Sequence, residues 1–263
     1  MNIPHTRWFP AIQVRRSRRL FKTLPVRGDV FARLQAVCES FTPFQSVSAK
    51  IITHSVNSIF KGALSHYGKI KGAPLCIAFI GDTRDPCVQE KVGFVGEGII
   101  LEATACGLGT CWVGGFFRPE VAASLIQAQE YEKVLAVTPI GYSAEKISLE
   151  EKIMTGFGKT HTRKPLEKLI IQKEGEMPEW VREALEAARI APSAVNRQPW
   201  RFMVKQNSIT ISVDSLKDTY HISKRIDCGI AMLHIELSAL YYGMKGTWEF
   251  LIPPHVARFT VPA

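Results

Sequence analysis

The 263-residue sequence has few cysteines, and they are spread along the chain. Its six cysteines include no Cys-x-x-Cys pair and no dense cluster, which excludes a disulfide framework or a zinc ribbon as the basis of the fold. Most lie in apolar runs, where a thiol behaves as a small hydrophobic side chain. The start of the chain also lacks the pattern of a cleavable signal sequence. We therefore expect a cytoplasmic protein in a reducing environment.

Metal-ligand spacing and a membrane span are also missing. One group of metal-ligating residue types falls in a short stretch: His221, Asp227, Cys228 and His234. Their spacing gives no ligand pair on one helical face, so no metal site is predicted. The apolar run over residues 98–117 is long enough to suggest a membrane helix. Glu102 and four glycines interrupt it, which favours a buried helix, a turn and a strand, with no membrane contact.

Acidic residues are fewer than basic ones: the sequence has 24 aspartates and glutamates and 33 lysines and arginines, which gives a formal net charge of +9. Such an excess can indicate binding to nucleic acid. No zinc-finger, RNP or helix-turn-helix pattern accompanies it, so no nucleic-acid partner is expected. Several positive residues gather instead at residues 15–19 and 159–168, where a phosphate site could use them. A hydrophobic fraction of 46% is typical of a globular protein.

Residues 191–200, APSAVNRQPW, form the most informative segment. They follow an amphipathic helix and precede an apolar strand. The two prolines stop a helix and favour extended backbone before them. Ser193, Asn196 and Gln198 would thus project polar groups from a stiff loop, which suits recognition of a flat polar heterocycle. The same residues are also compatible with an ordinary polar turn.

Three further segments complete a set. Residues 15–21 read RRSRRLF, residues 107–116 read GLGTCWVGGF, and residues 163–169 read RKPLEKL. Together with the APSAVNRQPW loop they resemble the FMN-dependent nitroreductase superfamily, and within it the TM nitroreductase subgroup, where TM refers to a source organism. In that family such segments surround one flavin. The sequence departs from ordinary members in one respect, because its APSAxN loop comes far downstream instead of in the first quarter of the chain.

An internal repeat accounts for this displacement. Two apolar helices are expected, each ending at a glycine and followed by a short strand with a tryptophan: residues 97–107 and 229–243. An amphipathic helix precedes each of them, with Asp29 as the N-cap of the first and Pro178 in the first turn of the second: residues 30–39 and 179–190. Since ordinary nitroreductases resemble dimers with flavin between the subunits, this chain looks like such a dimer fused into one polypeptide.

The expected fold is therefore α+β and nitroreductase-like, with two similar repeats in one chain that mimic the usual homodimer. The first repeat would span residues 1–172 and the second residues 173–263, with a linker at 165–176. Strands are expected at four places, of which the last two form a hairpin: residues 75–80, 134–142, 201–205 and 208–214. The first half lacks an APSAxN loop near Phe44, and the second half lacks an RRS segment. One flavin per chain, bound by a monomer, is the consequence.

The resemblance assigns flavin-binding positions. Arginine forks and a hydroxyl suit a phosphate. The positions that match the phosphate and ring-edge residues of the family are Arg15, Arg16, Ser17 and Arg19, and Arg163 matches the arginine of its tail. Read alone, RRSRR is also compatible with a solvated basic strand. The positions that match the loop over the flavin ring are Pro192, Ser193 and Asn196, with Gln198 and Trp200 as its anchors.

A further expectation concerns Gly96, Glu97 and Gly98. Their backbone amides would lie near N5 and O4 of the flavin, where donors favour the reduced form. Glu97 is equally compatible with a carboxylate that stabilises the start of a helix. His66 aligns roughly with the ribityl region, and a surface position is the alternative.

These patterns predict an FMN-dependent oxidoreductase that transfers hydride from NAD(P)H to a nitroaromatic, a quinone or a similar electron-poor small molecule. No catalytic side chain is expected, because the flavin carries the chemistry. The GLGTCW segment lacks the third glycine of a Rossmann fingerprint, so NAD(P)H would stack only transiently on the flavin. A non-catalytic FMN-binding protein, a flavin sensor or store, is the alternative.

Overall fold

The computed structural model of the protein describes residues 3–60, 70–144 and 162–262. Its helices and strands, in chain order, are α1 His5–Val14, α2 Gly28–Ser40, β1 Val47–Ile52, α3 Val56–Phe60, β2 Leu75–Asp82, α4 Val88–Ala105, β3 Gly109–Thr110, α5 Pro119–Ile126, β4 Glu132–Gly141, the 3-10 turn η1 Leu166–Lys168, β5 Ile170–Lys173, α7 Glu179–Arg189, the 3-10 turn η2 Ala194–Asn196, β6 Trp200–Lys205, β7 Ser208–Val213, α8 Lys224–Tyr241, β8 Thr247–Phe250 and β9 His255–Thr260.

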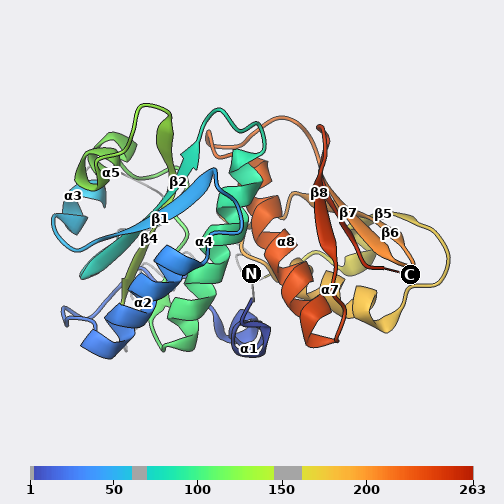
Figure 1. Ribbon diagram of the computed structural model, residues 1–263, viewed down its shortest axis with the longest axis horizontal. Coiled ribbons are helices and arrows are strands. Elements are labelled where there is room, and N and C mark those ends of the chain that lie inside the picture. The colour runs from blue at the N-terminus through green and yellow to red at the C-terminus, as the bar shows by residue number, and fades with distance from the viewer. Residues whose placement is uncertain (1–2, 61–69, 145–161, 263) are drawn as a thin grey trace.

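The strands form two sheets, which lie on opposite sides of the molecule (Figure 1). The first has the order β1-β2-β4-β3 and is antiparallel throughout. The second contains the antiparallel series β6-β7-β9-β8, and β5 pairs in parallel with β6. Apart from the additional helices α1, α3 and α5 of the first half, each half has a helix, two strands, a second helix and two further strands in the same chain order. Corresponding strands take corresponding places in the two sheets. The expected α+β class is confirmed.

Helices α4 and α8 pack against each other between the two sheets (Figure 1). Each has 18 residues and is buried on nearly every side, which explains why hydrophobic residues are not confined to one face of either helix. A Cβ atom on Gly93 would collide with the carbonyl oxygen of Ile226, and one on Gly229 would collide with that of Glu90. Each glycine thus admits the backbone of the opposite helix, and the contact has nearly the same form seen from either side.

Strand β2 is buried along almost its whole length because helices cover both faces of the first sheet. Its alternate residues Ile77 and Phe79 belong to the core shared with α4 and α8. The residues between them, such as Ala78 and Ile80, join a second cluster with α3 and α5. The buried ring of Phe79 thereby provides a packing surface for Trp112 in the segment that follows β3.

The strands and the hairpin expected from the sequence are confirmed as β2, β4, β6 and β7, with Asn207 in the turn between β6 and β7. The apolar run over residues 98–117 contains the second half of α4, then β3 and an irregular segment. Within the three described stretches, no helix is both long enough and apolar enough to traverse a bilayer.

Three expectations about element boundaries were wrong. Helix α2 begins at Gly28, so Asp29 lies in its first turn and pairs with Arg27 at 2.5 Å instead of capping it. Pro178 precedes the first turn of α7 instead of lying inside it. The supposed linker at residues 165–176 contains η1 and β5. Because β5 hydrogen-bonds to β6, residues 170–172 belong to the second sheet and not to the first. The division of the chain into two domains stays a prediction.

Candidate functional site

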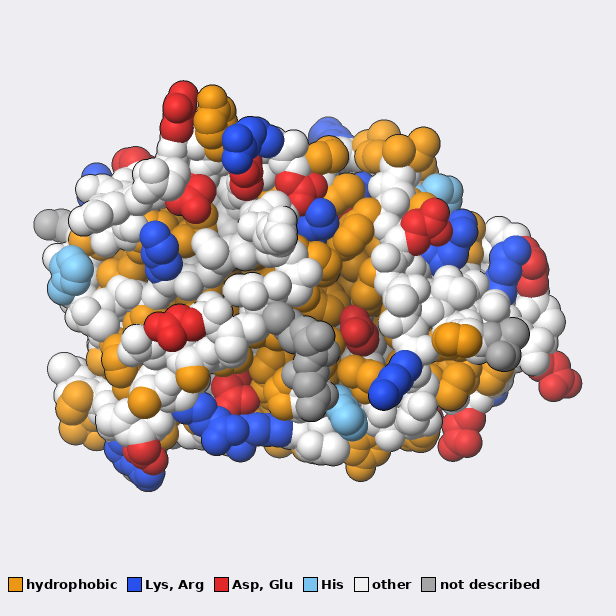
Figure 2. Space-filling model, in the orientation of Figure 1, with side chains coloured by type: hydrophobic (Ala, Val, Ile, Leu, Met, Phe, Trp, Pro, Cys, Tyr) orange, Lys and Arg blue, Asp and Glu red, His pale blue; other side chains and the backbone are white. Residues whose placement is uncertain are grey.

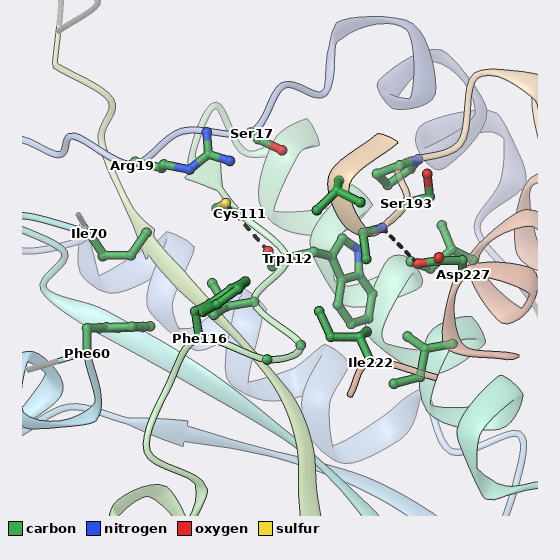
Figure 3. A pocket seen from close by; sticks show the side chains of 18 residues that line it. Ser17, Arg19, Phe60, Ile70, Cys111, Trp112, Phe116, Ser193, Ile222 and Asp227 are labelled. Carbon is green, nitrogen blue, oxygen red and sulfur yellow. Dashed lines mark hydrogen bonds between the residues drawn. The ribbon is translucent and has the colours of Figure 1, made fainter. Parts of the chain in front are cut away.

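A cavity of about 970 Å³, counting its open mouth, lies between the two halves of the chain. Figure 3 shows side chains from both halves pointing toward it. The residues that line it are Ser17, Arg19, Phe60, Ile70, Cys111, Trp112, Val113, Gly114, Gly115, Phe116, Pro192, Ser193, Ala194, Val195, Ile222, Ile226, Asp227 and Ile230. The lining is mostly apolar with a few polar side chains, which is typical of small-molecule and cofactor sites.

The segment after β3 forms one wall of the cavity with its backbone. A Cβ atom on Gly115 would lie 2.7 Å from Cγ1 of Ile222, so glycine allows this close approach without a shift of the Ile222 side chain. Gly114 lies against the same side chain. The sequence analysis quoted both glycines in GLGTCWVGGF but assigned them no role. Two consecutive glycines after a tryptophan were the signal that could have found this wall.

The opposite wall is the loop of residues 192–198. Gln198 is buried and anchors it, because its Oε1 accepts a hydrogen bond from the backbone N–H of Lys164 at 2.8 Å. Trp200 is fully buried beneath it. Ser193 faces the cavity, and its Oγ accepts a hydrogen bond from the backbone N–H of Gln198 at 3.0 Å. The loop is therefore held at its base and presents its tip to the cavity.

The tip of this loop has unusual backbone geometry. Val195 has φ 51° and Asn196 has φ 57°, a left-handed conformation that is costly for a β-branched residue. Asp227 of α8 holds the tip: its Oδ1 accepts from the backbone N–H of Ala194 at 3.0 Å, and its Oδ2 accepts from Nε of Arg197 at 2.6 Å. Burial raises the pKa of Asp227 to about 6, although Arg197 acts in the opposite direction. Sequence reasoning missed this anchor, because the pairing joins residues far apart in the chain.

Four guanidinium groups gather beside the cavity. Burial, together with the nearby positive charges of Arg15, Arg189 and Arg16, lowers the pKa of Arg163 to about 10. Arg163 also donates to Oδ1 of Asn196. Arg15 is only 8% exposed, and its Nη1 has no hydrogen-bond partner among the described residues. A buried donor of this kind, within concentrated positive charge, fits an anion such as a phosphate.

The sequence-predicted residues thus fall into three groups. Those that line the cavity are Ser17, Arg19, Pro192 and Ser193, and those that lie among or against the guanidinium groups are Arg15, Arg16, Arg163 and Asn196. Arg16 is exposed, and its Nη1 donates to the backbone oxygens of Gln13 and Arg15. His66 lies outside the described residues.

The third group, Gly96, Glu97 and Gly98, requires a correction. These residues lie in the interior of α4, where each backbone N–H is already bonded to the carbonyl four residues earlier. Their amides are therefore not free to donate to a flavin, and Glu97 is not at the start of the helix. Gly96 instead leaves room for the indole of Trp112, with which a Cβ atom would collide. The described residues contain no group of three or more His, Cys, Asp or Glu placed to hold a metal ion.

The sequence pattern of the family described as "Putative TM nitroreductase" matches residues 8–239, across both halves of the chain. The chain belongs to this family. A crystal structure of a "putative nitroreductase" from Thermotoga maritima is similar over 99% of this chain and 96% of its own, with a TM-score of 0.66 and 20% identity. The fold is therefore nitroreductase-like.

Two further structures are similar to part of this chain. A nitroreductase family protein from Clostridium difficile covers 64% of this chain and 96% of its own, with a TM-score of 0.46 and 20% identity. A nitroreductase with bound FMN from Bacteroides fragilis covers 54% of this chain and 91% of its own, with a TM-score of 0.42 and 20% identity. A search of curated proteins gives no significant match.

Proposed function

We propose that the protein is an FMN-dependent oxidoreductase that takes hydride from NAD(P)H and delivers it to a nitroaromatic, a quinone or a similarly electron-poor acceptor. The main support is the meeting of the family's characteristic segments around one cavity, beside a cluster of arginines with an unsatisfied donor. Membership of a nitroreductase family agrees with this chemistry.

The residues present fit FMN. Arg15 and Arg163 would hold the phosphate, since a doubly charged phosphate would satisfy Nη1 of Arg15 and balance the gathered positive charge. Trp112, Gly114 and Ser193 would contact the ring from the two walls of the cavity. Bound FMN supplies the acceptance and donation of hydride, while the protein binds, orients and shields it.

We further propose that the two halves correspond to the two subunits of an ordinary nitroreductase dimer. The support is the shared order of strands in both sheets and the reciprocal contact of Gly93 and Gly229 between α4 and α8. The cavity is lined by both halves, as a site between subunits would be. The chain would then act as a monomer.

The visible absorption spectrum of the purified protein tests the proposed function. We expect a yellow protein whose released cofactor is FMN, whose absorbance is bleached by NADH or NADPH without oxygen, and whose colour returns on addition of a nitroaromatic or a quinone. A protein that cannot be loaded with FMN would contradict the proposal. A yellow protein that no nicotinamide bleaches would favour a flavin-binding role without turnover.

A further inference from the structure

Glu97 is a fully buried carboxyl group at the contact between α4 and α8. Its Oε2 accepts a hydrogen bond from Nε1 of Trp112 at 2.7 Å. Its Oε1 lies 3.0 Å from Nε2 of His234 and 3.9 Å from Nε of Arg15. One carboxyl group therefore joins the cavity wall, the helix α8 of the other half and an arginine of the guanidinium cluster.

The contact between Glu97 and His234 contains a proton. Nδ1 of His234 lies 2.8 Å from the carbonyl oxygen of Ala187, which can only accept, so Nδ1 carries a hydrogen. The contact at Nε2 needs a second hydrogen, held either by the imidazole or by the carboxyl group. In both cases the pair is electrically neutral. His234 thus removes most of the cost of burying Glu97, and Arg15 compensates any remaining negative charge.

Trp112 is fixed on three sides. Gly96 leaves a notch in α4 that receives the indole, and the ring of Phe79 packs against it with centroids 4.9 Å apart. The hydrogen bond to Glu97 restricts the remaining motion, which is rotation of the indole within this notch. Figure 3 shows the indole facing the cavity between the two walls. An indole without this bond would leave a donor unsatisfied, because Glu97 is its acceptor.

We propose that Glu97 is a positioning residue: held by His234 and Arg15, its carboxyl group fixes the orientation of the Trp112 indole in the wall of the cavity. Glu97 does not line the cavity and acts through Trp112, which does. The proposal rests on the proposed function only for the identity of the group that lies against the indole, which would be FMN.

The second half provides a matched control. Trp248 follows Gly243 at the same spacing at which Trp112 follows Gly107. Its Nε1 donates to Oε2 of Glu236 in α8 at 2.8 Å, the same type of bond to the preceding helix. Neither Trp248 nor Glu236 lines the cavity. Breaking this second bond removes a comparable interaction without reaching the site.

The test uses the full chain labelled with 15N, in which the five tryptophans give indole N–H signals. Trp112→Phe identifies the signal of Trp112. Glu97→Gln replaces the carboxyl group by an amide, which still offers an acceptor, so the Trp112 signal should move. Glu97→Met removes the acceptor, so it should move the signal further and speed its exchange with solvent. Glu236→Met should change the signal of Trp248 and leave that of Trp112 in place.

FMN binding gives the second readout. Glu97→Met should weaken FMN binding about tenfold, in line with an unsatisfied buried donor. The loss should not add to that of Trp112→Phe in the double variant, because both break the same chain of contacts. Glu236→Met should bind FMN as the wild type does. Additive losses would overturn the proposal.

The two readouts separate the two proposals. An unchanged Trp112 signal in Glu97→Gln would overturn the positioning role even if Glu97→Met failed to fold. A wild-type protein that binds no FMN, with the expected changes in the indole signals, would contradict the proposed function and leave the positioning of Trp112 supported.

Discussion

Arg15 keeps a positive charge where little water reaches it. Burial lowers its pKa, and the nearest opposite charge is Glu97, which His234 already neutralises in large part. Arg163 is in a similar position, since among the described residues its guanidinium group donates to the neutral oxygens of Asn196 and Ile190. At the scale of the residue, the site therefore has more positive charge than its described neighbours balance.

This imbalance gives the first prediction. Arg15→Gln and Arg163→Ala should each remove a charge-assisted contact worth about 1.5–3 kcal/mol, which weakens FMN binding roughly tenfold or more. Arg16→Ala should have a smaller effect, because Nη1 of Arg16 already donates to two backbone oxygens. Fluorescence titration measures the affinities.

Riboflavin, which has no phosphate, is the control ligand. Arg118→Ala is the control variant, because Arg118 is exposed, pairs with Glu120 and does not line the cavity. Riboflavin should lose much less affinity than FMN in the Arg15 and Arg163 variants. Equal losses for both ligands would mean that these arginines act on the ring and not on a phosphate.

Asp227 gives a prediction for stability against pH. Its pKa is raised by burial from 3.8 to about 6, so the folded protein retains a proton that the unfolded chain releases between these values. This contribution to stability is complete below about pH 4 and is lost as the pH rises through about 6. Asp227→Asn removes it, so the free energy of unfolding should fall less steeply with pH in this window, by up to about 1.4 kcal/mol per pH unit.

Urea denaturation at several pH values between 4.5 and 7 measures this slope. Glu236, whose pKa burial raises to about 6, contributes a slope of the same sign in both proteins. Asp82→Asn is the control, because the half-buried Asp82 has its pKa lowered to about 2 by Arg84, and its contribution changes only at lower pH. Identical slopes for the wild type and Asp227→Asn would contradict the assignment.

At the scale of the element, the contact of α4 with α8 joins the two halves. Figure 2 shows hydrophobic side chains along the seam between them.

The sequence predicted both helices and their glycine ends, because apolar periodicity and a terminal glycine are local signals. The sequence did not predict β5, Ile170–Lys173. This segment is too short to give a local strand signal, and it is a strand because it hydrogen-bonds to β6. Glu97 was misplaced for a related reason: the partners that explain a buried carboxyl group, His234 and Trp112, are remote in the chain or beyond a turn.

The same contact predicts the effect of two small substitutions. Gly93→Ala and Gly229→Ala should each destabilise the protein by about 1–3 kcal/mol or more, because the added methyl group meets backbone atoms that cannot move aside. Gly28→Ala is the control, since nothing lies within 4 Å of its Cβ position at the start of α2. Chemical denaturation compares the three variants. A Gly93 or Gly229 variant as stable as Gly28→Ala would show that the helices do not approach so closely.

At the scale of the whole molecule, the two halves differ in what lies at equivalent places. With Gly93 set opposite Gly229, the cavity residues Ile226, Asp227 and Ile230 correspond to Glu90, Lys91 and Phe94. In the first half these positions are filled by packed side chains. The ring of Phe44 lies 5.4 Å from that of Phe94 and 5.5 Å from that of Phe250. Arg225 closes the region by pairing with the buried Glu90 at 2.5 Å. The sequence signal for this difference was the lack of an APSAxN loop near Phe44.

The last prediction concerns stoichiometry. Because aromatic rings and the Arg225–Glu90 ion pair occupy the counterpart of the cavity, and because its neighbourhood lacks an RRS segment, a second FMN would find neither space nor phosphate contacts. Titration of the protein with FMN should saturate near one FMN per chain, and light scattering coupled to gel filtration should find that FMN on a monomer. Saturation at two would mean that the packed region opens. If only an assembly of chains bound FMN, the second wall of the cavity would have to come from another copy. The two halves of one chain would then not complete a site.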